Sequence, residues 1–149
     1  MNQSTVRLWL LADGAEDARA GASRKGRAGR RCEYCRAPQP VTGVRFHLDH
    51  IVPESLGGTN DMDNLALACP MCNYHKSAHV LGADDEGLDD GRLFNPRQDH
   101  WDNHFVFDAV ILQLRGRTAE GQGTVNRLRM NDAIQIEARR HWVELDLYP

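Results

Sequence analysis

Two Cys-x-x-Cys pairs constrain the fold of this chain more than any other feature. Cys32 pairs with Cys35 and Cys69 with Cys72, and these are all of the cysteines in the sequence. A Cys-x-x-Cys turn directs both sulfurs at one ion, and two such turns complete a closed tetrahedron with Zn–S bonds of about 2.3 Å. We therefore expect Cys32, Cys35, Cys69 and Cys72 to hold one structural zinc ion.

Two other uses of the cysteines are weighed against zinc. A redox-active Cys-x-x-Cys would leave the second matched pair unexplained. Disulfides need an oxidising compartment, and the apolar run at residues 8–12 is too short for a secretory signal. We expect a cytoplasmic protein whose thiols stay reduced and available to a metal. No stretch approaches the ~20 apolar residues needed to cross a bilayer, so we expect no membrane-spanning segment.

The segment between the two pairs, residues 36–68, is longer than a usual zinc-ribbon loop, so further structure must fold inside it. From residue 44 to residue 53, apolar side chains alternate with polar ones, and this period of two predicts a strand with one buried face. Phe46 and Leu48 would form the buried face, and His47 and Asp49 the solvent-exposed face. Pro53 ends the strand because it lacks an N–H donor.

The residues that follow extend this pattern. Residues 57–61 predict a loop, because they are rich in residues that tolerate positive φ. Residues 64–68 predict a second short strand that runs into the second cysteine turn, and residues 73–79 predict the opening of a helix. The predicted order is therefore strand, loop, strand, helix.

These residues carry a resemblance to a known family. The motif consists of Cys32-Glu33-Tyr34-Cys35, His47 to Pro53, Gly57-Gly58, Asn64-Leu65, and Cys69 to Asn73 with Lys76. In this order and spacing it resembles the HNH endonucleases of the zinc-containing kind. The resemblance implies a ββα-metal core and the hydrolysis of phosphodiester bonds. A looser likeness to small stand-alone bacterial HNH proteins continues through residues 93–97, Trp101, 104–105 and 128–131.

The resemblance also implies roles for four polar residues. His50 would be the general base, because a neutral imidazole with an unperturbed pKa of about 6.5 can take a proton from water at cellular pH. Asp49 and Asn73 would hold a catalytic Mg²⁺ or Mn²⁺ ion through oxygen atoms, the ligands that these ions prefer. Asn64 would brace the loop between the strands and help to orient the imidazole. We therefore count it with His50 among the catalytic residues, in an indirect role.

Two further residues near the motif each have two interpretations. Lys76 follows Asn73 by three positions and shares its side of the predicted helix, where it would contact a phosphate or remain a solvated lysine. His47 would contact a phosphate or be a solvated histidine of the strand.

Charge is distributed unevenly along the sequence. The formal net charge is −3, yet seven basic residues lie between Arg19 and Arg36, against a single Glu33. Such a cluster neutralises backbone phosphates without sequence preference, or it is a solvated and disordered arm, as the interspersed glycines favour. Residues 84–90 carry five carboxylates without the spacing of a calcium loop, which predicts an exposed acidic loop.

The C-terminal part predicts a supporting layer. Residues 104–114 are rich in β-branched and aromatic residues and predict a hairpin that turns near Asp108. Apolar residues recur at helical spacing in residues 124–130 and 132–145, with Thr124 and Asp132 as N-caps. The predicted fold class is α+β, with a ββα-metal (HNH) core, a four-cysteine structural zinc site, a C-terminal β-hairpin and helices.

A chain of 149 residues has the length of one domain. We divide it into a basic, partly flexible segment at residues 1–30 and an HNH nuclease core with the zinc site at residues 31–82. Residues 83–149 form the acidic loop and the supporting hairpin and helical extension of the same domain.

Two classes of function remain. The first is an Mg²⁺- or Mn²⁺-dependent endonuclease that cuts DNA, with RNA left open as a substrate. The second is an inactive zinc-bound module that binds DNA or protein. Asp49, His50, Asn64 and Asn73 together favour the enzyme, because a binding module has no need of a carboxylate ligand beside a base. One active site per chain suits a monomer that nicks or a homodimer that cuts both strands.

Overall fold

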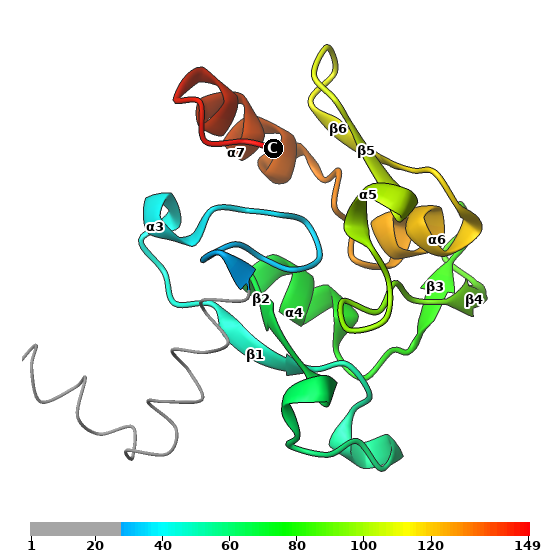
Figure 1. Ribbon diagram of the computed structural model, residues 1–149. Helices are drawn as coiled ribbons and strands as arrows, with labels where there is room; N and C mark the ends of the chain where they lie inside the picture. Colours follow the sequence, from blue (N-terminus) through cyan, green and yellow to red (C-terminus); the bar gives the residue numbers. More distant parts are fainter. Residues whose placement is uncertain (1–27) are drawn as a thin grey trace, which may run out of the picture.

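The computed structural model describes residues 28–149 and has the α+β architecture that the sequence predicts (Figure 1). The run at residues 8–12 and the basic residues from Arg19 to Arg27 lie outside the described residues. Within residues 28–149, no helix combines the length and apolar character that a membrane span requires.

Three antiparallel hairpins and several short helices make up the described part of the chain. The N-terminal half contains α3 (Gln39–Thr42), β1 (His47–His50), the 3-10 helices η1 (Glu54–Leu56) and η2 (Met62–Asn64), β2 (Leu65–Ala68) and α4 (Pro70–Lys76). The C-terminal half contains β3 (Leu81–Ala83), β4 (Asp89–Arg92), α5 (Trp101–His104), β5 (Phe105–Asp108), β6 (Gln113–Gly116), α6 (Ala119–Arg127) and α7 (Ala133–Glu144).

Strands β1 and β2 pair antiparallel, with His47 opposite Ala68 and His50 opposite Leu65. Helix α4 packs against both strands, so the predicted order of strand, loop, strand and helix is confirmed. The first strand is shorter than the predicted range of residues 44–53, and the second begins one residue later than predicted. Figure 1 shows this ββα unit beside the loop that begins at the first cysteine pair.

The predicted faces around β1 are correct for Phe46, which is buried, and for His47, which is exposed, but wrong for the next two residues. The Leu48 side chain is 40% exposed, whereas Asp49, expected on the solvent side, is only 5% exposed. Burial does not alternate along β1, since His47 and Leu48 are both exposed. Asp49 is buried because donors from Tyr34 and Lys76 satisfy its carboxylate. A buried carboxylate is stable when it is hydrogen-bonded and paired in this way.

Helix α4 begins inside the second cysteine pair, three residues before the predicted range of 73–79. Cys69 is its N-cap, and the Cys69 sulfur accepts a hydrogen bond from the Cys72 N–H at 3.4 Å. Pro70 occupies the first helical position, where its missing N–H costs no intrahelical hydrogen bond. The second cysteine turn and the start of α4 are therefore one piece of structure.

The C-terminal half contains the predicted hairpin and two helices, with one correction. Strands β5 and β6 pair after a turn that follows Asp108, and Asp132 precedes α7, both as predicted. The N-cap of α6 is Thr118 and not Thr124, since the Thr118 hydroxyl accepts from the N–H of Gly121 at 3.1 Å. Thr124 is buried inside the helix, where its hydroxyl donates to the Glu120 carbonyl at 2.7 Å.

The acidic residues at 84–90 lie at the turn of the β3–β4 hairpin and on β4. Most of them are exposed, as predicted. The Asp84 carboxylate shapes the turn, since it accepts hydrogen bonds from the N–H groups of Glu86 and Leu88.

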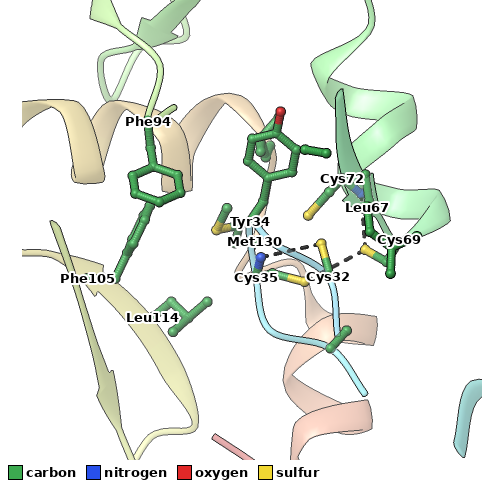
Figure 2. Close-up of a cluster of buried hydrophobic side chains, with 14 of the residues drawn as sticks. Cys32, Tyr34, Cys35, Leu67, Cys69, Cys72, Phe94, Phe105, Leu114 and Met130 are labelled. Carbon is green, nitrogen blue, oxygen red and sulfur yellow. Dashed lines mark hydrogen bonds between the residues drawn. The ribbon is translucent and has the colours of Figure 1, made fainter. Parts of the chain in front are cut away.

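One hydrophobic core joins the cysteines to the C-terminal half. Figure 2 shows Tyr34 and the cysteines on one side of this core and Phe94, Phe105 and Leu114 on the other. The rings of Phe94 and Phe105 meet edge to face, with centroids 5.0 Å apart. A segment too small to bury its own apolar surface is stabilised by such a layer.

Candidate functional site

The four cysteines form a buried cluster with the geometry of a tetrahedral metal site. Their sulfurs all lie within 4.8 Å of one another and point toward a common centre (Figure 2). The sulfurs of Cys35 and Cys69 are 3.7 Å apart. Zn–S bonds of about 2.3 Å in a regular tetrahedron place sulfurs about 3.8 Å from one another. The cluster therefore fits a structural zinc ion, and its closed shell of protein ligands leaves no position for a substrate.

All four cysteines are free thiols, so the disulfide alternative is not the one found. Hydrogen bonds with neighbouring sulfurs, together with burial, raise the pKa of the Cys35 and Cys72 thiols well above their usual range, and hydrogen bonds from the other three sulfurs lower the pKa of Cys69. Four buried thiolates need a compensating positive charge, which a divalent metal supplies.

Asp49, His50 and Asn73 line one open hollow on the surface of the ββα unit. Strand β1 contributes the first two residues and helix α4 the third, so the packing of the helix on the hairpin brings them together. The other residues around the hollow are Leu48, Pro53, Glu54, Ser77 and Ala78.

The imidazole of His50 has one strong partner. Its Nε2 lies 2.7 Å from Oδ1 of Asn60, and the carboxylate of Glu54 is farther away, at 3.9 Å. A carbonyl oxygen can only accept a hydrogen bond, so Nε2 carries the proton and Nδ1 is the nitrogen with a free lone pair. Asn60 was not predicted from the sequence as a partner of His50. Its only sequence signal is a polar side chain in the glycine-rich loop that follows the histidine.

The carboxylate of Asp49 is held from two sides. The Tyr34 hydroxyl donates to Oδ2 at 2.7 Å, and Nζ of Lys76 lies 3.2 Å from both carboxylate oxygens. Burial raises the pKa of Asp49, although Lys76 and Tyr34 act in the opposite direction.

Lys76 also donates to the His50 carbonyl at 2.8 Å, and its side chain is only 1% exposed. Both predicted interpretations of Lys76, a phosphate contact and a solvated lysine, are therefore wrong. The lysine follows the inner face of α4 toward β1, where it neutralises a buried carboxylate.

Asn64 lies outside the hollow and braces the loop that leads to it. Its amide oxygen accepts from the Val52 N–H at 2.9 Å, and its amide nitrogen donates to the carbonyls of Val52 and Thr59. Thr59 is the neighbour of Asn60, so this brace extends to the partner of His50. Gly58 is required here, because a Cβ at this position would lie 1.7 Å from the Val52 carbonyl oxygen.

A comparison with protein-family models agrees with this geometry. Residues 32–79 match the model of the HNH endonuclease family, described as HNH endonuclease. Residues 32–79 are an HNH endonuclease domain. The resemblance predicted from the motif is confirmed for this part of the chain. No curated protein and no solved structure matches the chain.

The HNH domain contains both cysteine pairs, the ββα unit and all residues of the hollow. The family implies a nucleic-acid substrate for this domain. The layer that covers its core comes from residues outside the match. For example, Trp101 donates from its indole nitrogen to the Tyr34 carbonyl at 2.7 Å, and Tyr148 donates from its hydroxyl to the Cys35 carbonyl at 2.8 Å.

Proposed function

We propose that this protein is a metal-dependent endonuclease that hydrolyses phosphodiester bonds in DNA. The observation that supports this proposal most is the meeting of Asp49, His50 and Asn73 around one open hollow of the HNH domain. A carboxylate, an imidazole and an amide oxygen at an open surface suit the hydrolysis of a polyanion, which needs a base and a cation.

His50 is the general base of the proposed reaction. Its Nε2–H donates to Asn60, which leaves Nδ1 to take a proton from the attacking water. Among residues 28–149, the structure gives Nδ1 no hydrogen-bond partner, so this nitrogen does not have to break a contact before it reacts. Asn64 acts indirectly, through the loop that carries Asn60.

Asp49 and Asn73 are the proposed ligands of a catalytic Mg²⁺ or Mn²⁺ ion. Their donor set fits these ions, which prefer carboxylate and amide oxygens and keep several waters. Oδ1 of Asp49 accepts a single hydrogen bond, from Lys76, and so retains a lone pair. When bound, the ion would stabilise the charge that develops on the scissile phosphate.

DNA is the proposed substrate, and basic residues near the first cysteine pair support the binding of a nucleic acid. Arg30, Arg31 and Arg36 belong to the predicted basic cluster and lie within the described part of the chain, close to Cys32 in sequence. The guanidinium of Arg36 stacks on Trp101 at 3.9 Å and pairs with Asp102. Arginines beside the first cysteine pair would contribute affinity for backbone phosphates of a nucleic acid, and this affinity would fall as salt rises.

One observation favours a second candidate, an inactive zinc-bound module that binds nucleic acid or protein. Both oxygens of Asp49 already have protein donors, as in a purely structural ion pair. In that case the hollow would hold no catalytic ion, and the HNH scaffold would serve for binding alone.

A plasmid-nicking assay separates the two candidates. The zinc-containing protein should convert supercoiled plasmid to the open circle with Mg²⁺ or Mn²⁺. A parallel reaction with RNA determines whether the protein cleaves DNA, RNA or both. His50→Ala should lower the rate by about 10²–10⁴-fold, the usual contribution of a general base. His79→Ala, at an exposed histidine of the same domain, is the matched control. Equal cleavage by wild type and His50→Ala would mean a contaminating nuclease or a wrong base.

A further inference from the structure

Each cysteine pair of the zinc cluster is connected to Asp49 by one side chain. We call residues 32–35 the first knuckle and residues 69–72 the second knuckle. Tyr34 lies inside the first knuckle, between Cys32 and Cys35. Lys76 lies on α4, the helix that begins in the second knuckle, four positions after Cys72.

Both connections are buried. Tyr34 is 0% exposed, and its hydroxyl donates to Oδ2 of Asp49 at 2.7 Å. Lys76 is also buried, and its Nζ lies 3.2 Å from each carboxylate oxygen. Residues four positions apart lie on the same side of a helix, so the second knuckle sets the position of Nζ. The carboxylate is thus held between one donor from each knuckle.

We propose that the zinc cluster orients the Asp49 carboxylate through Tyr34 and Lys76. By fixing the four sulfurs, the zinc ion fixes the two knuckles relative to each other, and with them the two donors that hold the carboxylate. Tyr34 and Lys76 are positioning residues, because they act through Asp49. This inference rests on the proposed function, in which Asp49 is a ligand of the catalytic cation.

Orientation matters because a carboxylate can rotate. The hydrogen bond from the Tyr34 hydroxyl to Oδ2 fixes the rotation of the Asp49 carboxylate, and thereby the directions in which the lone pairs of Oδ1 point. Without that hydroxyl, only the ammonium of Lys76 holds the group, and a point charge gives little directional preference. Outer partners that orient a metal ligand typically contribute 10–100-fold to metal affinity or activity.

Tyr34→Phe tests the inference, with Tyr148→Phe as the matched control. Each variant removes one buried hydroxyl from the surroundings of the first knuckle, since the Tyr148 hydroxyl donates to the Cys35 carbonyl. Of these two tyrosines, only Tyr34 contacts Asp49. The zinc content of each purified protein is measured first. Mn²⁺ affinity is then measured by calorimetry on the zinc-containing proteins, and Mn²⁺-dependent nicking is measured beside it.

We expect Tyr34→Phe to keep one zinc per chain and to bind Mn²⁺ about 10–100-fold more weakly than wild type. Tyr148→Phe should bind Mn²⁺ as wild type does. In an Asp49→Asn background, Tyr34→Phe should cause no further loss, because the group on which Tyr34 acts is already altered.

Three results would overturn the inference. One is equal Mn²⁺ affinity in Tyr34→Phe and wild type, and another is an equal loss in both tyrosine variants. The third is loss of zinc from Tyr34→Phe alone, since Tyr34 would then serve the zinc site itself. Failure of the proposed function is distinguishable, because in that case the wild-type protein itself would not nick DNA with Mg²⁺ or Mn²⁺.

Discussion

Lys76→Met removes one partner of a buried ion pair and leaves the other in place. Lys76 and Asp49 are 1% and 5% exposed, so solvent screens this pair very little. Breaking a buried pair by removing one partner costs about 3–5 kcal/mol, because the remaining charge is buried without compensation. Methionine is close to lysine in length and shape, so little of this loss would come from packing. We expect the free energy of unfolding to fall by this amount at neutral pH.

The loss should depend on pH in a definite direction. Burial already raises the pKa of Asp49, and Lys76 opposes this effect. Without Lys76 the folded-state pKa must rise further above the unfolded value of about 3.9. A carboxyl group with a raised folded-state pKa stabilises the fold while it is protonated, and this contribution is lost as pH rises through that pKa. The deficit of Lys76→Met relative to wild type should therefore be smaller at pH 5 than at pH 7.5.

Urea unfolding at these two pH values measures the deficit, with wild type compared at each pH so that any effect of pH on zinc binding cancels. The double variant Asp49→Asn/Lys76→Met removes the uncompensated charge and should recover part of the lost stability, although the hydrogen bond from Lys76 to the His50 carbonyl stays lost. A pH-independent deficit below about 1 kcal/mol would refute the reasoning, since exposed ion pairs contribute no more than this. Failure of Asp49→Asn to rescue Lys76→Met would refute it equally.

Three further predictions concern other parts of the molecule. Asn64→Ala removes the three hydrogen bonds that brace the loop beside Asn60. If the His50 imidazole then shifts by about 1 Å, plasmid nicking should slow about 100-fold. An unchanged rate would argue against an indirect catalytic role of Asn64. Removing zinc with a chelator should unfold the ββα unit, seen as loss of near-ultraviolet circular dichroism, and a retained signal would contradict a structural zinc ion. A hydrogen bond from Arg92 lowers the pKa of Asp99, so the ionised Asp99 stabilises the fold above about pH 4, and this contribution is lost as the pH falls further. Asp99→Asn should therefore flatten the acid side of a plot of Tm against pH. An unaltered plot would count against this pair.

The four-cysteine cluster and the ββα order were predictable because they depend on local rules. The two residues between paired cysteines place both sulfurs on one side of a turn, and four cysteines at this spacing have few alternatives. The hairpin and the helix follow from residue preferences within a few positions of each element.

The inner face of β1 could not be predicted in the same way. A period of two predicts that one face of a strand is buried and the other exposed, but burial along β1 does not alternate in this way. Here Asp49 is buried while His47, two positions earlier, is exposed, because donors from Tyr34 and Lys76, 15 and 27 positions away, meet the Asp49 carboxylate. Contacts over such separations depend on the tertiary fold and leave no trace in local periodicity.

The start of α6 was missed for another reason. Two glycines, Gly121 and Gly123, lie in its first turns, and glycine is a poor helix former. Gly121 is required by a close approach, since a Cβ there would lie 2.0 Å from the His104 carbonyl oxygen. The packing that requires glycine here therefore lowers the helix propensity of this segment, and a prediction based on propensity misses the start of the helix.

The hydrogen bond from Tyr148 to the Cys35 carbonyl spans 113 positions of the chain, and this separation sets an order of events during synthesis. A ribosome delivers all four thiols long before it delivers Tyr148, so the nascent chain passes through a stage at which its metal ligands are complete but uncovered. Exposed thiolates are the form of cysteine that oxidants attack most readily. Capture of zinc during translation would therefore protect the thiols before the C-terminal half closes over them.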